Sequence, residues 1–199
     1  GAAPPENGKI VVYSPRIMPR GLKETSSQIT VSFRLTESAP NTFTTERIDL
    51  QLNALDNEVF VVTGVKLDVE APDLIMGPGA GSVRTGVFAS VSKQDVSAGI
   101  ADLGNPSVFA TSSLVICGDD AIQPGGDFAY SNVGFIENDV DTPQNMEYLD
   151  VIATPDFYVN IDGSHNSSEK SVAGKLYGYR ARADSSTYAA LVQSELLSS

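Results

Sequence analysis

Gln28-Ile29-Thr30-Val31-Ser32-Phe33-Arg34-Leu35 is the stretch that decides the fold class of this chain. Polar and apolar residues alternate along it, so that four apolar side chains lie on one face of an extended strand. The same period of two recurs from Arg47 to Asn53 and from Gly64 to Glu70. These patterns predict strands with one buried and one solvated face, as in antiparallel sheets.

Strand signals continue along most of the chain. They are separated by turns rich in glycine and proline, such as residues 77–81 and 123–126, where glycine adopts positive φ and proline removes a backbone donor. About ten short strands result. Besides those above, the predicted strands are Lys9 to Tyr13, Glu58 to Val62, Val83 to Val91, Val108 to Cys117, Phe128 to Ile136, Glu147 to Ala153, Phe157 to Ile161 and Val172 to Arg182.

The C-terminus carries the one helical signal. Four apolar residues there fall on one helical face, and a group of capping residues precedes them. The apolar residues are Tyr188, Leu191, Val192 and Leu196, and the caps are Asp184, Ser185 and Ser186. A final strand over the same residues is the alternative.

The number of alternating strands determines the expected architecture. Each such strand has one apolar face to bury, so the strands are expected to form two sheets packed face to face. Immunoglobulin-like domains are near 100 residues, whereas an eight-stranded jelly roll with long loops fits 199 residues better. We therefore expect an all-β protein: an antiparallel β-sandwich of jelly-roll type over residues 27–199, with a short C-terminal helix. Residues 1–26 form an extended N-terminal arm in this division.

Charge is distributed unevenly along the chain. The formal net charge is −12, and residues 94–169 contain 13 acidic residues but no lysine or arginine. A surface of this kind repels phosphate backbones, so this acidic block is not expected to face nucleic acid. Residues 1–34 instead carry a net charge of +3. No apolar run approaches the roughly 20 residues of a membrane helix, so no membrane span is predicted.

The usual catalytic residues are scarce. His165 is the only histidine and lies in a Gly/Ser/Asn-rich turn, which is typical of a solvated side chain. Cys117 is the only cysteine, so no intrachain disulfide can form, and it closes an apolar run that predicts a buried, inert thiol. The sequence therefore predicts no catalytic site and no bound cofactor.

Metal binding is predicted only for calcium. Structural zinc sites need several cysteines and histidines. Residues 158–169 match part of an EF-hand loop, but Tyr158 occupies the first ligand position and the segment also resembles a strand. Glu137, Asp139 and Asp141 are spaced two apart, so an extended backbone directs all three to one side. They are the candidate Ca²⁺ ligands, and a solvated acidic loop is the alternative.

The whole layout resembles the jelly-roll capsid proteins of small icosahedral viruses. The features that carry this resemblance are the series of alternating strands, the proline-containing arm and the ending Lys175-Leu176-Tyr177-Gly178-Tyr179-Arg180-Ala181-Arg182-Ala183-Asp184, followed by Tyr188-Ala189-Ala190-Leu191-Val192. The resemblance implies a self-assembling structural protein of the virion shell, assembled in a host cell. It also implies that the arm and loops contact other copies of the chain and other virion proteins.

The arm departs from this family in one respect. Many such proteins have a strongly basic arm that binds the genome, whereas the arm here carries few basic residues. Any contact with nucleic acid would have to use Lys9, Arg16, Arg20 and Lys23. The apolar run Ile10 to Tyr13 lies outside the main strand series and is expected to find cover on a neighbouring copy.

Two other functions are compatible with the same sequence. A β-sandwich of this size also serves as a recognition or attachment module that binds a glycan or a protein. An enzyme would have to rely on carboxylate pairs, and nothing in the sequence selects such a pair. Glycan binding by a monomer would favour the recognition module, and turnover of a substrate would favour an enzyme.

Overall fold

The structure is a computed structural model that describes residues 19–73, 84–96, 102–117 and 147–197. These residues form nine strands, one short 3₁₀ helix and one α-helix. In chain order the elements are β1 (Leu22–Glu24), β2 (Ile29–Thr36), β3 (Thr44–Asp49), η1 (Ala54–Asp56), β4 (Glu58–Val69), β5 (Arg84–Ser92), β6 (Val108–Cys117), β7 (Asp150–Ile152), β8 (Asp156–Ser164), β9 (Ser171–Ala183) and α1 (Ser185–Leu197).

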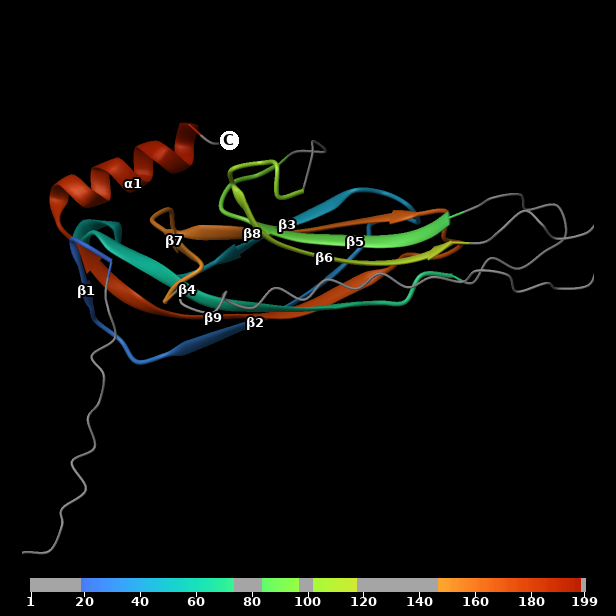
Figure 1. The fold of residues 1–199 in the computed structure, drawn as a ribbon, viewed down its shortest axis with the longest axis horizontal. Helices are drawn as coiled ribbons and strands as arrows, with labels where there is room; N and C mark the ends of the chain where they lie inside the picture. Colours follow the sequence, from blue (N-terminus) through green and yellow to red (C-terminus); the bar gives the residue numbers. More distant parts are fainter. Residues whose placement is uncertain (1–18, 74–83, 97–101, 118–146, 198–199) are drawn as a thin grey trace, which may run out of the picture.

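The strands form two antiparallel sheets that lie one above the other (Figure 1). The first sheet has the order β2-β9-β4-β7, and β1 pairs with the end of β9 beyond β2. The second sheet has the order β3-β8-β5-β6. From β2 onward the chain changes sheet at every connection except β5–β6, which is the order of an eight-stranded jelly roll. The predicted β-sandwich and C-terminal helix are confirmed.

The main core lies between the two sheets. Phe33 and Leu35 of the deciding stretch are buried there, while Ile29 and Val31 are half-buried against the same cluster. The ring of Phe33 meets that of Phe157 edge to face, with centroids 5.9 Å apart. The alternation therefore predicted the inward face of this strand correctly. Burial of each such side chain stabilises the fold by about 1.5–3 kcal/mol.

β4 covers the predicted strand from Gly64 together with the buried run Glu58 to Val62 that was expected to join it. A register shift between Val62 and Gly64 leaves one extra residue, which is a β-bulge. Phe60 and Val62 face the main core, whereas Val59 and Val61 belong to a second apolar cluster on the other side of the sheet. β4 is therefore apolar on both faces at this end, and helix α1 covers the outer one.

Helix α1 confirms the predicted helix and excludes the alternative strand. Asp184 caps it by accepting the backbone N–H of Thr187 at 2.7 Å, and this bond lowers the pKa of the Asp184 carboxyl group. Tyr188, Leu191 and Val192 pack on the second cluster as expected. Leu196, on the same predicted face, is 58% exposed.

The last residues of the arm belong to the first sheet. Lys23 in β1 lies opposite Arg182 in β9, and Leu22 packs against the second cluster. The predicted strands Lys9 to Tyr13 and Phe128 to Ile136 lie outside the described residues. Residues 50–53 were predicted to continue β3, but the strand ends at Asp49 and Leu50 donates its backbone N–H to Pro155.

Candidate functional site

One end of the sandwich brings together the β2–β3 connection, the end of β4, the start of β5 and the β8–β9 connection. Asn41 and Asn166 exchange two hydrogen bonds between the two connections, at 2.7 and 2.8 Å. Asn166 also accepts the backbone N–H of Asp73 and donates to the carbonyl of Gly86. Residues that are distant in sequence thus form one polar network, which we call the loop-end network.

Glu37 is the buried carboxylate of this network. Its side chain is almost fully shielded from solvent and accepts three backbone N–H groups, from Thr42, Gly163 and Lys170, at 2.9–3.0 Å. A buried carboxylate needs such donors because it has lost its hydration. Glu37 therefore holds both connections in fixed positions relative to β8.

Asp73 and Lys170 form the ion pair of the network, 2.8 Å apart. The Asp73 carboxylate also accepts the backbone N–H and the hydroxyl of Ser167, both at 2.6 Å. Lys170 and then Ser167 hold the pKa of Asp73 well below its usual range. The potential glycosylation sequence at Asn166 lies within this network, where the Asn166 side chain is buried and its amide is hydrogen-bonded.

A second polar feature lies on the outer face of the second sheet, β3-β8-β5-β6. Val159 and Ile161 of β8 face the main core, so Asn160 between them points to the outer face. Here a cavity of about 210 Å³ is lined by side chains from β8, β5 and two connections. We call it the outer-face cleft, and its main lining residues are Phe43, Phe88, Ser90, Asp102, Asn160 and Asp162.

Asn160 is only 1% exposed although it lies on the outer face. Its Nδ2 donates to Ser90 Oγ at 3.0 Å and to Ser92 Oγ at 3.2 Å. The Ser92 hydroxyl donates to the Gln94 carbonyl, so its oxygen has to accept from Asn160, which fixes the orientation of the amide. The Oδ1 atom of Asn160 is left buried without a hydrogen-bond partner among the described residues.

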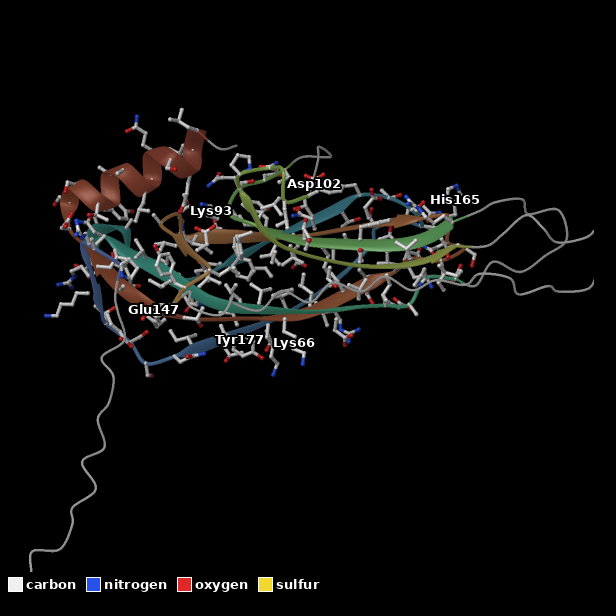
Figure 2. All side chains as sticks on the ribbon, viewed as in Figure 1. Lys66, Lys93, Asp102, Glu147, His165 and Tyr177 are labelled. Atoms are coloured by element: carbon white, nitrogen blue, oxygen red, sulfur yellow. The ribbon has the colours of Figure 1, made fainter. Side chains whose placement is uncertain are left out.

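The negative side chains of the outer-face cleft differ in their surroundings. Asp102 lies on the β5–β6 connection above the sheet (Figure 2) and accepts the backbone N–H of Gly104 at 2.9 Å. Asp162 extends from β8, and burial, followed by the nearby charge of Glu37, raises the pKa of its carboxyl group. Both carboxylates are exposed, so the cleft is acceptor-rich and open to solvent at these two side chains.

Some predicted site residues lie in the described part of the chain. Arg20 and Lys23 of the arm are exposed. His165 is exposed at the loop end (Figure 2), as predicted, and its Nδ1 lies 3.0 Å from the carbonyl oxygen of Arg84. The partial EF-hand match is not a calcium loop, because Asp156–Ser164 forms strand β8.

Other predicted residues fall outside the described ranges. These are the calcium candidates Glu137, Asp139 and Asp141, and Lys9 and Arg16 of the arm. Within residues 19–73, 84–96, 102–117 and 147–197, no three metal-binding side chains come together. The structure describes Cys117 only as the last residue of β6.

Sequence reasoning missed the residues that build both features. Glu37, Asp73 and Lys170 stand in polar turns that resemble ordinary solvated loops, and nothing local shows that they meet. Asn160 and Ser90 gave a weak signal, because each is a polar residue between two apolar neighbours on a predicted strand. That pattern places them on an outer face but does not show that the face is covered.

Comparison with known proteins adds no family to this description. No protein-family model matches the chain, and no curated protein matches it significantly. No helix among the described residues is long and apolar enough to cross a membrane. The fold class of the chain therefore rests on its strand order, which is that of a jelly-roll β-sandwich.

Proposed function

We propose that this protein is a self-assembling structural subunit of an icosahedral virion shell. The observation that carries the proposal is the pairing of the strand orders β2-β9-β4-β7 and β3-β8-β5-β6, which is the jelly roll used by many viral capsid proteins. Lectin domains share this architecture, so the fold by itself does not assign the function. The surfaces available for assembly supply further support.

The arm offers one means of contact between copies. It precedes β1, which lies with β2 along one side of β9 at the edge of the first sheet. An edge strand has unpaired backbone N–H and C=O groups that can pair with an added strand. The apolar run Ile10 to Tyr13 has the composition of such a strand, and we propose that it docks on a neighbouring copy.

The loop end offers a second means of contact. Association costs free energy for every side chain and loop that it orders. The loop-end network has already ordered the β2–β3 and β8–β9 connections through Glu37 and the Asp73–Lys170 pair. A neighbouring copy that contacts this end would therefore lose little conformational entropy in the connections.

Removal of the arm tests this proposal. The deletion should end at residue 18, because Leu22 packs on the second cluster and β1 is part of the first sheet. We expect the full chain to sediment as particles of uniform, very large mass. The chain lacking residues 1–18 should sediment as monomers or small oligomers, with an unchanged circular dichroism spectrum.

Point variants provide a matched control in the full-length chain. Ile10→Asp combined with Val12→Asp places two charges on one face of the proposed docking strand and should prevent assembly, whereas Glu6→Ala should not. A full chain that stays monomeric at all concentrations would exclude the shell function. Normal assembly without residues 1–18 would exclude the role of the arm.

A further inference from the structure

The outer-face cleft has the chemistry of a binding site for a cation that donates hydrogen bonds. We propose that it binds a single alkylammonium group, either the side chain of a lysine in another polypeptide or one end of a free polyamine. The proposal does not depend on the assembly of the protein. It concerns a different surface from the arm and the loop-end network.

The orphan acceptor is the first observation. Asn160 Oδ1 has no partner among the described residues, and the network of Ser90 and Ser92 prevents the amide from turning to offer its Nδ2 instead. A buried acceptor without a donor costs about 1–3 kcal/mol. A ligand that donates a hydrogen bond here would remove this cost, whereas a ligand that only accepts would not.

The charge of the lining is the second observation. Asp102 and Asp162 both line the cleft, and no described lysine or arginine does. Arg84 is a described cation beside one lining side chain, and its guanidinium lies 5.9 Å from the centroid of the Phe88 ring. Arg84 is exposed and does not line the cleft, so the charge of the two carboxylates is left for a ligand to neutralise.

The aromatic rings determine the kind of cation. Phe43 and Phe88 form apolar parts of the wall. The Arg84 guanidinium already lies over Phe88, so Phe43 is the ring with no described cation over it, and such a ring attracts ammonium groups through its π face. A calcium ion would need six to eight oxygen ligands, far more than Asp102, Asp162 and Asn160 provide. An anion would be repelled by the two carboxylates.

The size of the cavity limits the ligand. Sites for drug-sized molecules occupy about 300–1,000 Å³, whereas the cleft measures about 210 Å³. It can therefore hold one alkylammonium chain. An ammonium group has three donors, which matches the three acceptors Asp102, Asp162 and Asn160.

Titration of the full chain with three small probes tests the proposal. The probes are 1,5-diaminopentane, Nα-acetyl-lysine amide and Nα-acetyl-norleucine amide, whose side chain has nearly the length of lysine but no charge. Isothermal titration calorimetry should show saturable binding of at least one amine in the millimolar range, as few heavy atoms make contact. Norleucine amide should not bind. Tighter binding of the lysine amide indicates a polypeptide ligand, and tighter binding of the diamine indicates a free polyamine.

Variants at the two carboxylates test whether the cleft is the site. Asp102→Asn and Asp162→Asn should each weaken amine binding by about tenfold, equivalent to 1.4 kcal/mol. Asp68→Asn, an exposed carboxylate on the other sheet, should leave the affinity unchanged. Circular dichroism would verify that each variant is folded. Equal binding of the norleucine amide, no amine binding at all, or unchanged affinity in both cleft variants would overturn the proposal.

Discussion

The polar residues buried at the loop end act as structural groups with several partners each. Glu37 accepts three backbone donors, and Lys170 contributes both a backbone donor to Glu37 and its ammonium group to Asp73. Removal of one partner from such a network leaves the others desolvated and unpaired, which costs more than the bond itself contributes. Stability should therefore be sensitive to single changes here.

Replacement of Asp73 by asparagine should show this sensitivity. The Lys170 side chain is only 7% exposed, and loss of the Asp73 charge leaves it without its counter-ion. Because Asp73 itself is 29% exposed, we expect the free energy of unfolding at pH 7 to fall by about 2–3 kcal/mol rather than by the full value for a buried pair. Asp68→Asn is the control and should change it by less than about 0.5 kcal/mol. Urea unfolding measures both.

The effect of Asp73 should also depend on pH. Its carboxyl pKa is lowered in the folded state, so its contribution to stability is complete above the ordinary carboxyl pKa of about 3.9. The contribution is lost as the pH falls through the lowered folded pKa. The difference between the wild type and Asp73→Asn should thus be constant from pH 8 to 5 and narrow below about pH 4. A difference that persists unchanged at pH 3 would contradict this interpretation.

Two glycines in the first sheet make a matched pair at the residue scale. A Cβ atom at Gly178 would collide with the carbonyl oxygen of Val61 and the ring of Phe60, whereas at Gly64 the nearest atom is Tyr177 Cδ2 at 3.8 Å. Gly178→Ala should destabilise the protein by about 2–3 kcal/mol through overpacking. Gly64→Ala should change stability by less than about 1 kcal/mol. Thermal unfolding measures both variants, and Gly178→Ala should melt at the lower temperature. Equal melting temperatures would contradict the close packing described around Gly178.

At the scale of elements, helix α1 is attached to the sandwich by a buried charge as well as by apolar contacts. Glu195 is 1% exposed, and its carboxylate accepts the backbone N–H groups of Ala153 and Thr154 at 2.6 and 3.0 Å. Tyr188, Leu191 and Val192 supply the apolar contacts. The end of the helix is therefore held against the β7–β8 connection by hydrogen bonds.

Removal of the Glu195 carboxylate should loosen this end of the helix. In Glu195→Ala, amide hydrogen exchange in the last turns of α1 and at Ala153 and Thr154 should accelerate at least about tenfold, since the buried donors lose their acceptor. Gln193→Ala, an exposed position on the same helix, should leave exchange unchanged. Equal exchange in both variants would show that the apolar contacts alone hold the helix.

The sequence predicted the positions of the strands and the helix better than the contacts that their side chains make. Alternation identified β2, β3 and the second half of β4, because each has one face toward the core and the signal is local. The missed features depend on what lies across from a residue. Leu196 is apolar but exposed, whereas its neighbour Glu195 is buried because its carboxylate accepts the backbone N–H groups of Ala153 and Thr154. The extent of β7 was overestimated for a similar reason, as only Asp150–Ile152 finds a partner in β4.

The candidate sites could not be predicted from local patterns. Glu37, Asp73 and Asn166 come from three connections that meet only after the sheets have formed. Asn160 is buried on the outer face, where it lines one cavity together with Asp102 of the β5–β6 connection and Phe43. These arrangements are non-local, and a single sequence carries no direct record of them.

At the scale of the whole molecule, the acidic block determines how copies can approach each other. Seven of its 13 acidic residues are described, and none of them is buried. Asp150 pairs with Lys93 at 3.3 Å, and Asp156 lies 3.8 Å from Arg47. The described part of the block is thus at the surface, which agrees with a solvent-facing role.

Calcium dependence distinguishes the two roles that the sequence left open for this block. If it faces solvent, treatment of assembled particles with a chelator should leave their sedimentation unchanged across a salt series, because no bridging ion is removed. If Glu137, Asp139 and Asp141 bind calcium between copies, the chelator should dissociate the particles, and calcium but not sodium should restore them. We expect the first outcome.

Electron microscopy of the purified full chain tests the central claim most directly. A jelly-roll subunit with an assembling arm should form closed particles of one or a few discrete diameters, with icosahedral symmetry in the averaged images. The images should be recorded from about 0.05 to 1 M salt, because a net charge of −12 opposes association at low ionic strength. Closed symmetric shells are the predicted result. Monomers or small oligomers at every protein and salt concentration would contradict the account.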